Sequence, residues 1–86
     1  MRAQVRVSLD ALRHVQERGG RLFVWRENAL VRAATEQPRS GIWSRQRADG
    51  FVLCFAGGVA PAPLIRVELR TLPEVALVAY DDGLQT

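Results

Sequence analysis

The feature that most constrains the fold of this chain is the glycine pair Gly19–Gly20, because it ends the one stretch with helical periodicity. Ser8, a favourable helix N-cap residue, precedes that stretch, and glycine is the usual residue just beyond a helix C-terminus. Apolar residues recur at three-residue spacing in between, which is typical of a helix with one buried face. The stripe consists of Leu9, Leu12 and Val15. We therefore predict a single helix over about residues 9–18.

After the glycine pair, the pattern changes to short segments in which apolar residues mostly alternate with polar ones, separated by turn residues. This period of two predicts strands. The expected strands are 21–26, 29–35, 42–47, 51–56, 64–70 and 75–80, with a further short strand at 5–7 before the helix. The order predicts an α+β fold: one N-terminal helix packed on a curled, mostly antiparallel sheet of about six strands.

At 86 residues the chain forms one domain, residues 1–86, and its composition is that of an ordinary globular protein. The uninterrupted apolar run at 51–56 is typical of a central strand covered on both faces. The expected core consists of Leu12, Val15, Leu22, Val24, Phe51, Leu53, Phe55, Val67, Leu69 and Val78.

The absence of whole residue types excludes several chemistries. All twelve basic residues are arginine, so neither a Schiff base nor the lysine of a Walker A loop is available. One histidine and one cysteine cannot build a zinc or iron–sulphur site within one chain. We therefore expect a non-catalytic protein without cofactor or metal.

The remaining reactive residues have simpler interpretations. His14 falls opposite the apolar helix stripe, so we expect it on the solvated face and not as a general base. Cys54 lies in an apolar strand and is expected to pack in the core. Asp81–Asp82–Gly83 resembles a turn more than a cation site, and residues 60–63 a rigid connection more than a polyproline ligand.

Localisation follows from three features of the sequence. A lone cysteine cannot form an intrachain disulfide, the N-terminus lacks the apolar region of a signal peptide, and the longest uncharged run is broken by glycine and proline. We expect a cytoplasmic protein with no membrane partner.

The beginning of the chain resembles a known family. Val5-Arg-Val-Ser-Leu-Asp-Ala-Leu-Arg-His-Val15, followed by Gly20-Arg-Leu-Phe-Val24, is similar to the opening of the HesB-like, A-type iron–sulphur carriers. The resemblance covers residues 5–25 and implies a short strand, a capped helix and a second strand. That family binds its cluster through three cysteines, one after the second strand and two near the C-terminus. This chain has none of the three, so the resemblance implies the fold without the cluster.

One constellation of residues offers a candidate binding surface. In two of the expected strands, tryptophan alternates with arginine, so that both residue types share a strand face. The two sets are Arg21, Phe23 and Trp25 in one strand and Trp43, Arg45 and Arg47 in the other. If both faces lie on the same side of the sheet, they form an aromatic–arginine platform of the kind that binds single-stranded nucleic acid. The candidate residues are Arg21, Trp25, Trp43, Arg45 and Arg47.

The competing interpretation is that these aromatic side chains serve the core. The opposite strand faces, Leu22 with Val24 and Ile42 with Ser44, are only moderately apolar, which favours inward-facing aromatic residues. A net charge of +3 is also low for a nucleic-acid binder, although ten arginines fall within residues 1–47. We therefore expect an accessory or protein-interaction domain, with a homodimer as one possible form. The alternative is single-stranded nucleic-acid binding.

Overall fold

The α+β class is confirmed by a computed structural model, which describes residues 4–56 and 64–82. The segment 60–63 and the pair Gly57–Gly58 lie outside the described residues. The elements are β1 (Gln4–Val7), α1 (Leu9–Glu17), β2 (Arg21–Glu27), β3 (Leu30–Ala34), β4 (Trp43–Ala48), β5 (Phe51–Ala56), β6 (Leu64–Arg70) and β7 (Ala76–Asp81). These elements match the predicted helix and strands to within one residue at every boundary.

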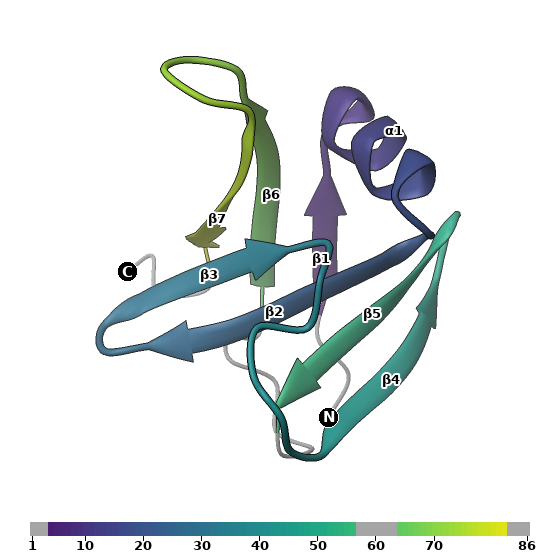
Figure 1. Ribbon diagram of the computed structural model, residues 1–86, viewed down its shortest axis with the longest axis vertical. Helices are drawn as coiled ribbons and strands as arrows, with labels where there is room; N and C mark the ends of the chain where they lie inside the picture. Colours follow the sequence, from purple (N-terminus) through teal and green to yellow (C-terminus); the bar gives the residue numbers. More distant parts are fainter. Residues whose placement is uncertain (1–3, 57–63, 83–86) are drawn as a thin grey trace.

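The strands form two mixed sheets and not the single curled sheet that we predicted (Figure 1). One sheet has the order β1-β6-β7, and the other has the order β3-β2-β5-β4. The difference arises because β6 pairs in parallel with β1, and β5 in parallel with β2, each joining strands far apart in the sequence. Strand periodicity specifies which residues face inward but not which strand is the neighbour.

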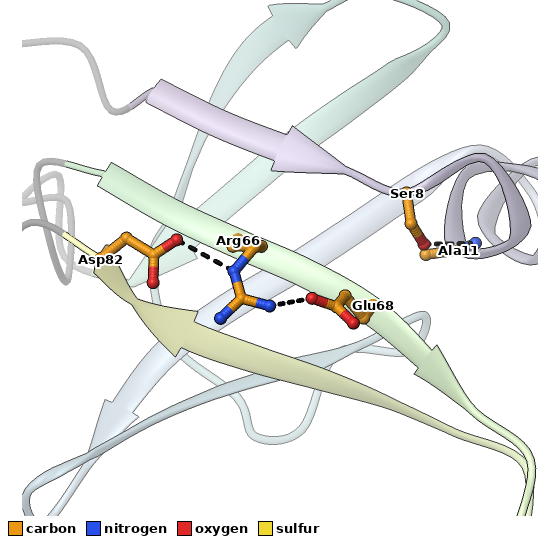
Figure 2. A network of polar contacts seen from close by, with 5 residues as sticks. All are labelled: Ser8, Ala11, Arg66, Glu68 and Asp82. Atoms are coloured by element: carbon orange, nitrogen blue, oxygen red, sulfur yellow. Dashed lines mark hydrogen bonds and ion pairs between the residues drawn. The ribbon is translucent and has the colours of Figure 1, made fainter.

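Helix α1 begins and ends where its capping residues predict. The Ser8 hydroxyl accepts a hydrogen bond from the Ala11 backbone N–H at 3.2 Å (Figure 2). At the other end, the Gly20 N–H donates to the Val15 carbonyl at 2.9 Å, and Gly19 and Gly20 both have positive φ.

Among the described residues, no helix is long and apolar enough to cross a bilayer.

The buried face of α1 is shifted from the predicted stripe. Ala11 and Val15, one turn apart, are fully buried against β2, β5 and β6, whereas Leu12 is half-buried. Leu9 is 69% exposed, so its assignment to the apolar stripe was wrong. The helix touches both sheets and approaches them closely, and the small side chain of Ala11 suits that contact. The buried face of α1 therefore follows the four-residue spacing of Ala11 and Val15 and not the predicted three-residue spacing.

Most of the predicted core is confirmed. Seven of the predicted residues are buried: Val15, Leu22, Val24, Phe51, Leu53, Phe55 and Val67. Leu69 is half-buried and packs against this cluster. Val78 was wrongly assigned to the core, because its partner across the ladder is Glu68 on the outer face. Leu77 and Ala79 pack against the core instead.

Two arginines pair with the carboxylates at the end of β7, one within the three-stranded sheet and one across to the other sheet. Arg66 of β6 forms an ion pair with Asp82 at 3.0 Å and a second one with Glu68 (Figure 2). Its guanidinium also lies 4.1 Å from the centre of the Tyr80 ring. Arg26 of β2 reaches across to Asp81 of β7 at 2.9 Å and so joins the two sheets. Both carboxylates of the predicted turn are therefore paired with arginines. Gly83 of that turn lies outside the described residues.

The pair between Arg26 and Asp81 should contribute measurably to stability, because the Asp81 side chain is only 12% exposed. We expect Asp81→Asn to lower the free energy of unfolding by about 1 kcal/mol, the usual net size of an intramolecular hydrogen bond, because Arg26 is 38% exposed and solvent screens the pair. A double-mutant cycle with Arg26→Gln, followed by urea denaturation, isolates the pairwise contribution. The control is Glu27→Gln, whose partner Arg32 is 3.8 Å away and half-exposed, and it should cost under about 0.5 kcal/mol. Equal losses of unfolding free energy for Asp81→Asn and Glu27→Gln would contradict a stabilising role of the Arg26–Asp81 pair.

Candidate arginine–aromatic interface

The candidate residues share one face of the four-stranded sheet. The central strand β5 fixes this arrangement, because Val52 pairs with Arg21 on one side and with Arg47 on the other. Cys54 likewise pairs with Phe23 on β2 and with Arg45 on β4, and Ala56 pairs with Trp43. Residues paired across a ladder point to the same side of the sheet. We call this surface the arginine–aromatic face, defined by Arg21, Phe23, Trp25, Trp43, Arg45 and Arg47.

This face lies on the side of the sheet opposite the core cluster, so the expectation that its aromatic side chains point inward was wrong for Trp25 and Trp43, which are half-buried. Phe23 is buried on this face. The core side of β2 is formed by Leu22 and Val24, which are both fully buried. Their partners on β5, Leu53 and Phe55, are buried with them in the same cluster. The core cluster is therefore built on the other side of the sheet and contains neither tryptophan.

The aromatic residues of this face pack on one another. Phe23 is buried, and its ring lies edge to face with Trp43 at a centroid distance of 5.4 Å. Trp25 lies edge to face with Trp43 at 6.4 Å and an interplanar angle of 84°. The Trp43 indole N–H donates to the Arg39 carbonyl at 3.1 Å. Both indoles are half-buried, so each keeps some surface open to a ligand.

The arginines of this face are available for a ligand. Arg21, Arg45 and Arg47 are exposed, and within residues 4–56 and 64–82 no carboxylate lies within ion-pair distance of them. Arg32, which was not among the predicted residues, pairs with Trp25 across the ladder and adds a fourth guanidinium, which is itself ion-paired with Glu27 at 3.8 Å. Arg32 lies on this face because β2 and β3 form a hairpin in which Trp25 is its partner. Four arginines against Glu27 give the face a positive potential.

Cys54 points to this same side of the sheet, between Phe23 and Arg45, and is buried, as predicted. Burial raises the pKa of its thiol above the ordinary value of 9.0, and the positive charges of Arg45 and Arg21 offset part of that increase. A buried thiol with a raised pKa is poorly nucleophilic at neutral pH. Cys54 is therefore a packing residue of the sheet.

We expect the Cys54 thiol to react with a disulfide reagent about 100-fold more slowly in the folded protein than in urea, since labelling requires local opening. Rapid labelling of the folded protein would contradict the burial of Cys54.

The raised pKa of Cys54 also predicts that the stability of the protein depends on pH. Below the unfolded pKa the thiol is protonated in both states, so stability is unaffected. As the pH rises above about 9, the unfolded thiol ionises first, and stability falls until the folded thiol ionises too. Cys54→Ala should remove this component from urea titrations between about pH 8 and 10.

His14 does not lie on a fully solvated face as predicted. It is half-buried and lines a hollow of about 270 Å³ together with Arg18 and Thr35. The remaining lining residues come from β3 and from the start of β7. Helical spacing wrongly predicted that His14 is exposed, because the residues that cover it come from strands distant in the sequence.

Comparison with models of protein families, with curated proteins and with solved structures finds no match. The resemblance of residues 5–25 to the HesB-like family therefore remains a prediction. Within the described residues, no three histidine, cysteine, aspartate or glutamate side chains gather closely enough to hold a metal ion. Metal analysis of purified protein is the direct test of the predicted absence of metal.

Proposed function

We propose that this protein is a non-catalytic, cytoplasmic module that binds single-stranded nucleic acid through the arginine–aromatic face. The observation that carries the proposal is that both tryptophans and three arginines, which have no acidic partner within residues 4–56 and 64–82, lie on one sheet face away from the core. Of the two sequence arguments against this function, the inward orientation of the tryptophans no longer applies, because both lie on the sheet face away from the core. The other, the net charge of +3, describes the whole chain and not this face, where Arg21, Arg45 and Arg47 lie together.

The chemistry of the face suits a flexible anionic strand. Arg21, Arg45 and Arg47 would contact phosphates, and the indoles of Trp25 and Trp43 would stack on bases. Because the two indole rings are nearly perpendicular, we expect one stacked base on each and not a continuous stack. Each stacked base contributes about 1–3 kcal/mol, largely independent of its identity. The expected binding is moderate in affinity and broad in sequence preference.

A titration with a ten-nucleotide thymidine oligomer tests the proposal. The chain contains only two tryptophans, and both belong to the face, so stacking should quench the intrinsic fluorescence directly. With three arginine–phosphate contacts, the logarithm of the association constant should fall against the logarithm of salt concentration with a slope of about −2. Absence of quenching at low salt, or a slope near zero, would contradict the proposal.

A further inference from the structure

Positive charges and aromatic rings occupy opposite ends of the arginine–aromatic face. Arg21 and Arg47 both pair with Val52 near the start of β5, whereas Trp43 pairs with Ala56 at the end of that strand. The two levels are about 13 Å apart along the strand. Because β5 lies between β2 and β4 (Figure 1), the two arginines stand about 10 Å apart, one on each side of it. The face therefore has an arginine end and an aromatic end.

Arg45 belongs to the arginine end as well. It lies two residues from Arg47 on β4, points to the same side of the sheet and pairs with Cys54. Burial raises the pKa of the Cys54 thiol, and the positive charges of Arg45 and Arg21 offset part of that increase. Two guanidiniums that come from opposite sides of β5 therefore lie within electrostatic reach of the same point.

This gathering of like charge is not neutralised within the part of the chain that the structure describes. Arg21, Arg45 and Arg47 are exposed, and none of them forms an ion pair with a carboxylate in residues 4–56 and 64–82. Like charges on neighbouring positions of a sheet repel one another and lower stability. An arrangement that costs stability in the free protein is expected where a ligand of opposite charge binds.

We propose that the arginine end binds the terminal phosphate of a single nucleic-acid strand, whose nearby bases stack on Trp25 and Trp43. A terminal phosphate monoester carries about −1.5 to −2 charges at pH 7 and presents three free oxygens, whereas each internal phosphate carries a single charge. Three guanidiniums, each able to donate two parallel N–H bonds, suit the terminal group better than an internal one. The inference rests on the proposed nucleic-acid binding and adds which part of the strand this face binds.

Three ten-nucleotide thymidine oligomers test the inference: one with hydroxyls at both ends, one with a 5′-phosphate and one with a 3′-phosphate. Their affinities are measured by tryptophan fluorescence at neutral pH and low salt. We expect at least one phosphorylated oligomer to bind about tenfold or more tightly than the unphosphorylated one, and the tighter of the two identifies the end that the face accepts. Equal affinity for all three would overturn the inference and leave the proposed function in place. Failure of all three to bind would overturn both.

Variants at the two ends of the face locate the preference for the terminal phosphate. Arg21→Gln/Arg47→Gln should reduce the preference to about twofold or less, because only Arg45 remains at the arginine end. Trp25→Leu should weaken the binding of all three oligomers by a similar factor and keep the preference, since it removes a stacking ring at the aromatic end. Loss of the preference in the Trp25→Leu variant would contradict this division of the face.

The matched control for net charge is Arg13→Gln/Arg70→Gln, which removes two exposed positive charges outside the arginine–aromatic face. It should keep most of the preference, above about fivefold, because distant charges act on all three oligomers alike. Circular dichroism confirms that each variant is folded. If the two arginine double variants lose the preference equally, overall charge and not the arginine end recognises the phosphate, and the inference is overturned.

Discussion

Replacing Leu53 with alanine is expected to lower the free energy of unfolding by about 3 to 5 kcal/mol, at the upper end of the range for buried leucines. Leu53 is fully buried on β5, between Leu22 of β2 and Gln46 of β4. Close neighbours on both sides limit how far the structure can relax into the cavity. For a domain of this size such a loss is a large part of the total stability, which is about 4 to 13 kcal/mol.

Urea denaturation followed by circular dichroism measures this effect, provided that the m-value is unchanged. Leu9→Ala is the matched control, because it removes the same atoms from a side chain that is 69% exposed. It should change stability by less than about 0.5 kcal/mol. A loss below about 1 kcal/mol for Leu53→Ala, or a larger loss for Leu9→Ala, would contradict the assigned core.

The second large effect concerns the arginine–aromatic face. Arg45→Glu/Arg47→Glu should weaken oligonucleotide binding at least about 30-fold at 50 mM salt, because it removes two phosphate contacts and adds repulsion. Both side chains are exposed, so the fold should remain intact. The salt dependence should also become shallower than in the unchanged protein.

Arg13→Glu/Arg70→Glu provides the control for net charge, since both arginines are exposed and neither belongs to the arginine–aromatic face. It should weaken oligonucleotide binding by no more than about threefold, through long-range electrostatics alone. If the two double variants lose affinity equally, the binding is a property of overall charge and not of this face.

Much of the fold could be predicted because it is encoded locally. The Ser8 cap and the glycine pair at 19–20 define the helix, and alternation in segments such as 64–70 defines strands whose inward residues are correct. The candidate face was also predictable in part. Alternation along each strand placed Trp25 with Arg21 and Trp43 with Arg45 and Arg47. That the two strands present these residues on the same side of the sheet follows only from the pairing of both with β5.

The remaining features depend on contacts between distant segments. Nothing in the local pattern of β5 or β6 indicates a parallel partner, so one sheet was predicted where there are two. Val78 was assigned to the core because its segment is apolar throughout, and only the register with β6 shows that Leu77 and Ala79 face inward. The hollow lined by His14 escaped prediction for the same reason, because α1, β3 and β7 meet only in the folded chain.

The most direct test of nucleic-acid binding is the response of the two indole N–H signals in a ¹H–¹⁵N correlation spectrum. With two tryptophans in the chain, the spectrum contains two such signals, which mutation of Trp25 or Trp43 to phenylalanine assigns. Adding the thymidine oligomer at low salt should shift both signals progressively and saturably, and raising the salt should reverse the shifts. Binding that leaves both signals unmoved, or no binding at low salt, would contradict the proposed function.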